Sequence, residues 1–163
     1  MRTVHDWLDE YAASHRNSVN RRFHYACIPP IVFSVICALK AIPAGDAWLN
    51  PASVVMVLAL LWYLRLSWRL TVGLVLVFCV LYGAALALQA ATGANFIWVT
   101  LAIFVAGWIG QFIGHAIEGA RPSFFKDLQF LLVGPLWELA HVYRQLGLPV
   151  DGARARYRTD GHA

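Results

Sequence analysis

Charged side chains are scarce in this chain of 163 residues: they make up 13% of it, against about 25% in an ordinary soluble domain. Apolar residues make up 60%, which excludes intrinsic disorder because the chain has ample hydrophobic surface to bury. The length is sufficient for one compact unit, and a soluble unit of that size could not hide so much apolar surface. The composition therefore predicts a single integral membrane domain.

Cysteine is scarce as well, and a targeting signal is not evident. Cys27, Cys37 and Cys79 lie inside apolar runs without CxxC spacing, which excludes a disulfide framework and a cysteine-based zinc site. Several acidic and basic residues precede the first apolar run, and no cleavage site follows a short apolar segment. We therefore expect no cleavable signal peptide.

The distribution of the charges predicts the membrane spans. Residues 70–117 contain no Asp, Glu, Lys or Arg, and this stretch is too long for one span, so the polar break at residues 91–95 divides it. Together with two upstream apolar runs it predicts an all-α integral membrane bundle of about four transmembrane helices. The expected elements are spans near 25–41, 49–66, 70–91 and 95–118, a re-entrant or interfacial helix at 128–142, and a loose basic tail at 151–163.

The N-terminal residues 3–14 predict an amphipathic helix at the membrane surface, with Thr3 as its cap. Its apolar side chains recur at helical spacing: Val4, Trp7, Leu8 and Tyr11.

The basic residues predict the orientation of the bundle. Of the 13 Lys and Arg residues, only Lys40 falls in a loop on one side of the expected membrane, and the other twelve fall on the opposite side. The positive-inside rule then places both termini in the cytoplasm. Topology and contact with membrane lipids account for the net charge of +4, so no nucleic-acid partner is expected.

A few polar side chains are not explained by topology. Gln111, His115 and Glu118 have i, i+4 and i+7 spacing and share one helix face. The predicted topology puts His24 and His115 at the same side of the membrane, and His15 is close enough in sequence to fold back there. Imidazoles that converge with a carboxylate predict a metal site for Fe(II), Mn(II) or Zn(II).

Other polar residues are candidates for supporting roles. Asn20 and Gln111 are expected to orient the histidine rings through hydrogen bonds. Glu138 and His141 have the i, i+3 spacing found in di-metal bundles and are secondary candidates as ligands.

These polar residues form two motifs that resemble the membrane-bound 2-hydroxy fatty acid α-dioxygenases. The resemblance extends from about residue 11 to residue 138, which is most of the chain. The first motif is carried by Tyr11, His15, Asn17, Asn20 and His24. The second is carried by Gln111, Phe112, Gly114, His115, Glu118 and Pro122.

The resemblance implies an Fe(II)-dependent enzyme that uses O2 to shorten a 2-hydroxy fatty acid by one carbon, located in a bacterial inner membrane or in the endoplasmic reticulum. By the same resemblance His15, His24 and His115 hold the iron. From their positions, Arg21, Arg22 or Arg121 are expected to meet the substrate carboxylate. Glu118 is expected to ligate the iron or to orient a histidine.

Two other classes of function stay open at this point. The chain is also compatible with a small membrane transporter or scaffold that has no enzymatic activity, although no internal repeat is visible. The remaining alternative is another lipid-active metalloenzyme, namely a zinc hydrolase or a di-iron oxygenase.

Overall fold

The computed structural model describes residues 2–119 and 129–150. Within them the chain forms α-helices and one short 3-10 helix, and no strand. The elements are α1 (Val4–Ala13), α2 (Ser18–Lys40), α3 (Pro51–Leu66), α4 (Trp68–Thr92), η1 (Gly93–Asn95), α5 (Phe96–Glu118) and α6 (Phe130–Gln145). The expectation of an all-α protein is therefore confirmed for the described residues.

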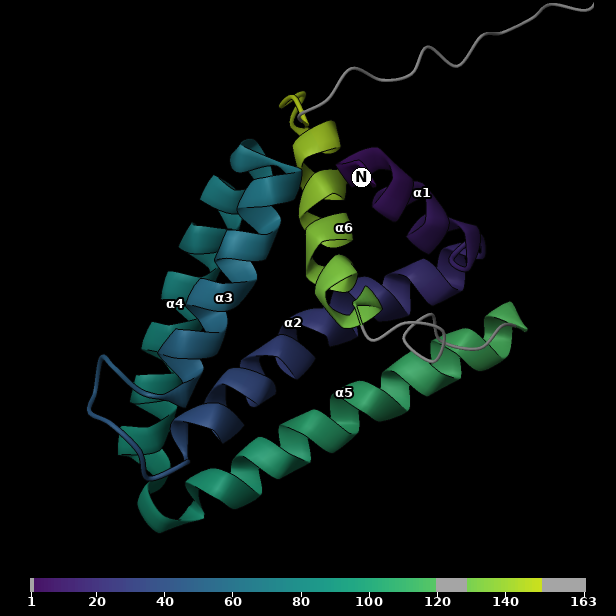
Figure 1. Cartoon of the computed structure of the whole chain (residues 1–163). Helices are drawn as coiled ribbons and strands as arrows, with labels where there is room; N and C mark the ends of the chain where they lie inside the picture. The colour runs from purple at the N-terminus through teal and green to yellow at the C-terminus, as the bar shows by residue number, and fades with distance from the viewer. Residues whose placement is uncertain (1, 120–128, 151–163) are drawn as a thin grey trace, which may run out of the picture.

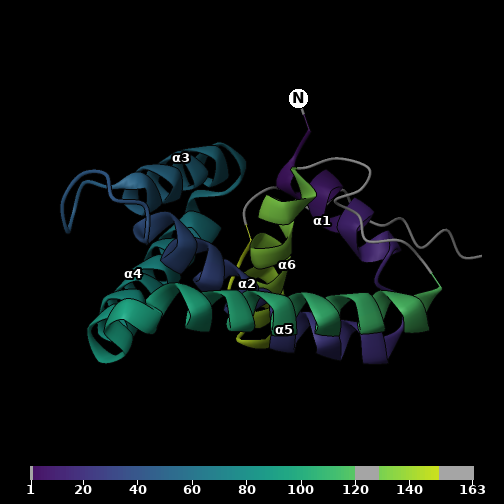
Figure 2. The same cartoon turned by 90° about the horizontal axis from the view of Figure 1, so that it is seen from below.

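Helix α2 is the central element of the structure. It contacts α3, α4, α5 and α6, and its most extensive partner is α5, which runs alongside it in the opposite direction (Figures 1 and 2). Helices α3 and α4 form a second pair on one side of α2, and α6 packs between this pair and α1. The beginning of α2 and the end of α5 consequently lie at the same end of the molecule (Figure 1).

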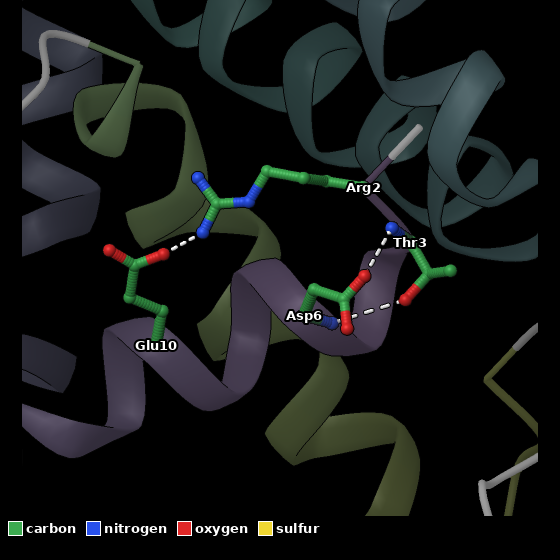
Figure 3. Close-up of polar contacts among 4 residues, drawn as sticks. All are labelled: Arg2, Thr3, Asp6 and Glu10. Carbon is green, nitrogen blue, oxygen red and sulfur yellow. Dashed lines mark hydrogen bonds and ion pairs between the residues drawn. The ribbon is translucent and has the colours of Figure 1, made fainter.

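The N-terminal helix and its cap confirm that part of the prediction made from the sequence, whereas its place at the membrane surface remains a prediction. Thr3 is the N-cap: its side chain accepts a hydrogen bond from the Asp6 backbone at 3.2 Å, and its own N–H donates to the Asp6 carboxylate at 2.7 Å (Figure 3). This capping box pairs backbone groups that the first turn leaves without partners. The predicted apolar face of α1 is buried, and an ion pair between Arg2 and Glu10 lies on its exposed side (Figure 3).

Small residues allow α2 and α5 to approach closely. Gly107, Gly110 and Gly114 on α5 all face α2. A Cβ atom at Gly114 would lie only 2.5 Å from the Asn20 side-chain oxygen, so a larger residue would push the helices apart. This is the packing by small residues that is common between helices in membranes.

Two helical stretches of the described chain are long and apolar enough to cross a membrane, namely Ser18–Lys40 and Trp68–Glu118. The second stretch contains both α4 and α5, which are separated at Gly93, where φ is +51°. Helix α3 is apolar but shorter. Arrangement as four spans therefore remains a prediction.

Helix boundaries differ from the predicted span limits where polar residues extend a helix. Helix α2 begins at Ser18 because Asn17 caps it, its side chain accepting from the Val19 N–H at 2.8 Å. Within the segment predicted at 128–142, α6 begins at Phe130 and continues without a break despite Pro135 in its interior. Tyr63 anchors this helix by donating to the Leu132 carbonyl at 2.8 Å. The predicted basic tail at 151–163 lies outside the described residues.

Candidate metal centre

Three histidines meet at the end of the molecule where α2 begins and α5 ends. His15 lies in the turn between α1 and α2, His24 is in the second turn of α2, and His115 is near the end of α5. One ring nitrogen of each residue lies within 4.8 Å of those of the other two. The side chains are almost completely buried, with exposed fractions of 2%, 1% and 4%. We refer to these residues as the histidine cluster.

Backbone carbonyl groups fix the orientation of two of the rings. His15 Nδ1 lies 2.5 Å from the Tyr11 carbonyl oxygen, and His24 Nδ1 lies 3.0 Å from the Asn20 carbonyl oxygen. Because a carbonyl oxygen only accepts, each Nδ1 carries the proton and each neutral ring has a lone pair at Nε2. A backbone partner on the far nitrogen is also the usual arrangement for histidines that ligate a metal.

The two Nε2 atoms point toward each other and are 2.9 Å apart. With both Nδ1 atoms protonated, two lone pairs would face each other in a buried site, which is unfavourable without a cation or a proton between them. Burial, the largest effect, and the nearby His115 lower the pKa of His15 to about 4, although the Tyr11 carbonyl and Glu118 oppose the shift. The ring is therefore neutral at neutral pH, and the donor set fits a divalent metal ion.

Glu118 holds the turn that carries His15. Its carboxylate accepts hydrogen bonds from the backbone N–H groups of Arg16 at 3.0 Å and Asn17 at 2.9 Å. A third bond comes from the Asn20 side-chain amide at 3.1 Å. Both carboxylate oxygens of Glu118 are therefore engaged by protein donors, and Glu118 is not part of the three-histidine group among the described residues. This geometry favours an indirect role over direct ligation of a metal.

Asn20 and Gln111, the residues expected to orient the histidine rings, lie in different surroundings. Asn20 orients the His24 ring through its backbone carbonyl, while its side chain binds Glu118. Gln111 is buried beside the cluster and lines a cavity together with His24 and His115. Its Nε2 atom makes no hydrogen bond within the described part of the chain, so it is available to a ligand in that cavity.

Aromatic side chains form a wall of the cluster that the sequence pattern did not reveal. The Tyr11 ring stacks on His15 with centroids 4.2 Å apart and an interplanar angle of 14°, and Trp137 lies 5.8 Å from the same ring. Tyr11 belongs to the first sequence motif, but no local signal connects Trp137 with residues of α1. Together these rings shield one side of the cluster from water.

The secondary candidates Glu138 and His141 are not brought into the cluster. His141 stacks on Tyr25 with centroids 4.9 Å apart, and its Nε2 atom lies 3.0 Å from the Gln145 amide nitrogen. Glu138 lies among apolar side chains, and one of its oxygens has no partner among the described residues. Burial raises the pKa of this carboxyl to about 8, so it is mainly protonated at neutral pH.

A basic bowl opens beside His15. Its volume is about 660 Å³, and no acidic residue is found in the described lining. Basic side chains reach it from the turn before α2, from α2 and from α6: Arg16, Arg21, Arg22, His141 and Arg144. Arg21 thus lines the same bowl as His15, whereas Arg121 lies outside the described residues.

The fold and this cluster define an all-α protein with a buried candidate metal centre of three histidines. Comparison of the chain with known protein families identifies the family to which it belongs. The family described as 2-hydroxy-palmitic acid dioxygenase Mpo1-like matches residues 1–146, and the chain belongs to this family. The resemblance seen in the two motifs is therefore confirmed, and the family description indicates a dioxygenase-like enzyme of fatty-acid metabolism. No curated protein matches the chain, and no solved structure matches it.

Proposed function

We propose that this protein is an Fe(II)-dependent dioxygenase that shortens a 2-hydroxy fatty acid by one carbon with O2. The observation that carries the proposal is the histidine cluster, in which neutral imidazoles converge and two Nε2 atoms are 2.9 Å apart. The family description supplies the class of substrate. Three protein ligands leave positions open for a substrate and O2, as in other non-haem iron oxygenases.

The reaction balances without a further reductant. The acid R–CH(OH)–COOH and one O2 give R–COOH, one CO2 and one water. The C1–C2 bond breaks, C1 leaves as CO2, and C2 becomes the new carboxyl carbon. The four electrons that the two carbons lose are those that reduce O2, so the substrate is itself the only electron donor.

The surroundings of the cluster fit such a substrate. The basic bowl beside His15 provides Arg21 and its neighbours to hold the carboxylate, because guanidinium groups bind carboxylates in a bidentate manner. The Gln111 amide faces the cavity bordered by His24 and His115 and can donate to an oxygen of the acid. Tyr11 and Trp137 exclude water from the cluster. Bound Fe(II) would supply the electron-transfer chemistry with O2 and a Lewis-acid position for the substrate.

A zinc hydrolase is the second candidate. The observation in its favour is that the cluster contains only histidines and no carboxylate, and three histidines also hold catalytic zinc in known enzymes. The two candidates differ in their need for O2. A hydrolase works equally well without O2, whereas the proposed dioxygenase consumes one O2 for each acid that it shortens.

The test is to incubate purified protein, loaded anaerobically with Fe(II), with 2-hydroxyhexadecanoic acid before and after admission of O2. We expect pentadecanoic acid and CO2 only with O2, and loss of both products in His15→Ala, His24→Ala and His115→Ala. His5→Ala is the matched control, since it removes an imidazole on α1 that belongs neither to the cluster nor to the basic bowl. Shortened acid without O2, or full activity in a cluster variant, would overturn the proposal.

The membrane arrangement belongs to the same proposal. Two helical stretches are long and apolar enough to cross a membrane, and the basic residues are concentrated on one predicted side. Four spans with both termini in the cytoplasm would place the basic bowl at the cytoplasmic surface. The acid could then enter from the membrane while its carboxylate remains at the interface.

A further inference from the structure

A small apolar cavity adjoins the histidine cluster on the side of α6. Its volume is about 60 Å³, and it is bordered by His24, His115 and Gln111. The remaining lining is mainly hydrocarbon from α2 and α6, including Ile28 and Val32. A cavity of this size holds only the first part of a fatty acid, so a longer chain must continue elsewhere.

A second apolar space begins where the first ends. This groove has a volume of about 190 Å³ and lies between α2, α4 and α6. It shares Ile28, Val32 and Pro135 with the small cavity, so the two spaces adjoin at these side chains. On α4 it is lined by Leu74, Val77, Phe78 and Leu81. We call it the α2/α4/α6 groove.

Gly134 borders the small cavity and precedes the shared residue Pro135. A Cβ atom at this position would lie 3.1 Å from Ile28 Cδ1 and 3.3 Å from the Tyr11 hydroxyl. A larger residue would therefore crowd Ile28 and Tyr11, where α6 packs closely against α2 and α1. Pro135 follows directly and cannot donate a backbone hydrogen bond to Leu131, whose side chain also borders the small cavity.

We propose that the hydrocarbon chain of the substrate passes from the histidine cluster between the side chains of Ile28, Val32 and Pro135 and lies in the α2/α4/α6 groove. This inference rests on the proposed function, because the cluster is taken as the place where the acid group is held. Three observations support a hydrocarbon occupant: the groove continues from the cavity of the cluster, its lining is apolar apart from Glu138, and Val77 on its rim is exposed. The groove therefore sets the accepted chain length.

Turnover of acids of different length tests the path. In Val77→Trp the indole fills the groove. We expect kcat/KM for 2-hydroxyhexadecanoic acid to fall about tenfold or more, while that for 2-hydroxyhexanoic acid is retained. Val80→Trp is the matched control, since Val80 is exposed on the same helix and does not line the groove. Unchanged preference for chain length in Val77→Trp, with normal activity, would overturn the path.

A binding measurement separates this inference from the proposed reaction. A 2-hydroxy fatty acid with a diazirine at its terminal carbon is photolysed with the protein, and the labelled peptides are identified. We expect label on residues 74–81 of α4 or on Leu139 and Val142 of α6, all competed by unlabelled 2-hydroxyhexadecanoic acid. Label elsewhere, or label that is not competed, contradicts the path. If no acid is shortened in the activity test, the proposed reaction is wrong, but the labelling still shows where the hydrocarbon chain of the acid lies.

Discussion

The position of Glu118 predicts that a residue outside the metal-binding group controls metal affinity. Its carboxylate joins the end of α5 to the turn before α2 through three hydrogen bonds, at 2.9, 3.0 and 3.1 Å. Two of these donors are the backbone N–H groups that follow His15 directly in the chain. Glu118→Gln keeps the size of the side chain but removes its charge and one of its acceptor oxygens.

The magnitude follows from the strength of those bonds. A hydrogen bond to a charged group contributes about 1.5–3 kcal/mol, and the low end applies because Glu118 is only half-buried. We expect the substitution to destabilise the turn by about 2 kcal/mol. If the whole of this cost appears as lost organisation of His15, the Kd for the metal rises about thirtyfold, since each 1.4 kcal/mol corresponds to a factor of ten.

The assay is an anaerobic Fe(II) titration in competition with a coloured chelator, combined with hydrogen exchange of the Arg16 and Asn17 amides. Both amides should exchange faster in Glu118→Gln because they lose acceptor strength. Glu10→Gln is the control, since it makes the same chemical change in an exposed ion pair with Arg2. Unchanged metal affinity together with unchanged amide exchange would refute the reasoning.

Four further predictions follow from particular contacts. Gly114→Ala places a Cβ 2.5 Å from the Asn20 oxygen and should lower the free energy of unfolding by about 1–3 kcal/mol, as measured in denaturant; unaltered stability would contradict the close packing of α2 and α5. The pKa of Glu138 is raised to about 8 in the folded protein, so at intermediate pH the folded state holds a proton that the unfolded chain has lost. The free energy of unfolding should therefore decrease as the pH rises from about 4.5 to about 8, by at most about 1.4 kcal/mol per pH unit. In Glu138→Gln the melting temperature should depend less on pH over this range. An unchanged pH dependence would contradict the assignment of this effect to Glu138. Arg21→Gln should raise KM for the acid about tenfold with a smaller change in kcat, and an unaltered KM would remove Arg21 from the carboxylate site. A reporter inserted at Asp46 should read as non-cytoplasmic, whereas a cytoplasmic signal would reverse the proposed orientation.

Local features of the structure could be predicted from the sequence. The helix α1 with its Thr3 cap follows from residue spacing and cap chemistry within a few positions, and the structure confirms both. The all-α class follows from composition and from long uncharged runs. The proximity of His15, His24 and His115 could be predicted from the expected topology of four spans. In that topology the first span begins and the fourth span ends on the same side of the membrane.

Features that depend on contacts between distant residues could not be predicted. The bonds of Glu118 to Arg16 and Asn17 join positions about a hundred residues apart, and their geometry depends on how closely the glycines of α5 let α2 approach. The position of the Trp137 ring beside His15 requires α6 to pack against the turn. The close packing around Gly134 likewise exists only because α1, α2 and α6 meet there.

The metal content of the protein tests the central claim most directly. Protein equilibrated anaerobically with Fe(II), freed of unbound metal and analysed by mass spectrometry should contain about one iron per chain. His15→Ala, His24→Ala and His115→Ala should each lose that iron while remaining folded, and His141→Ala should keep it. Iron that is absent from the unaltered protein, or that is retained in all three cluster variants, would contradict the account.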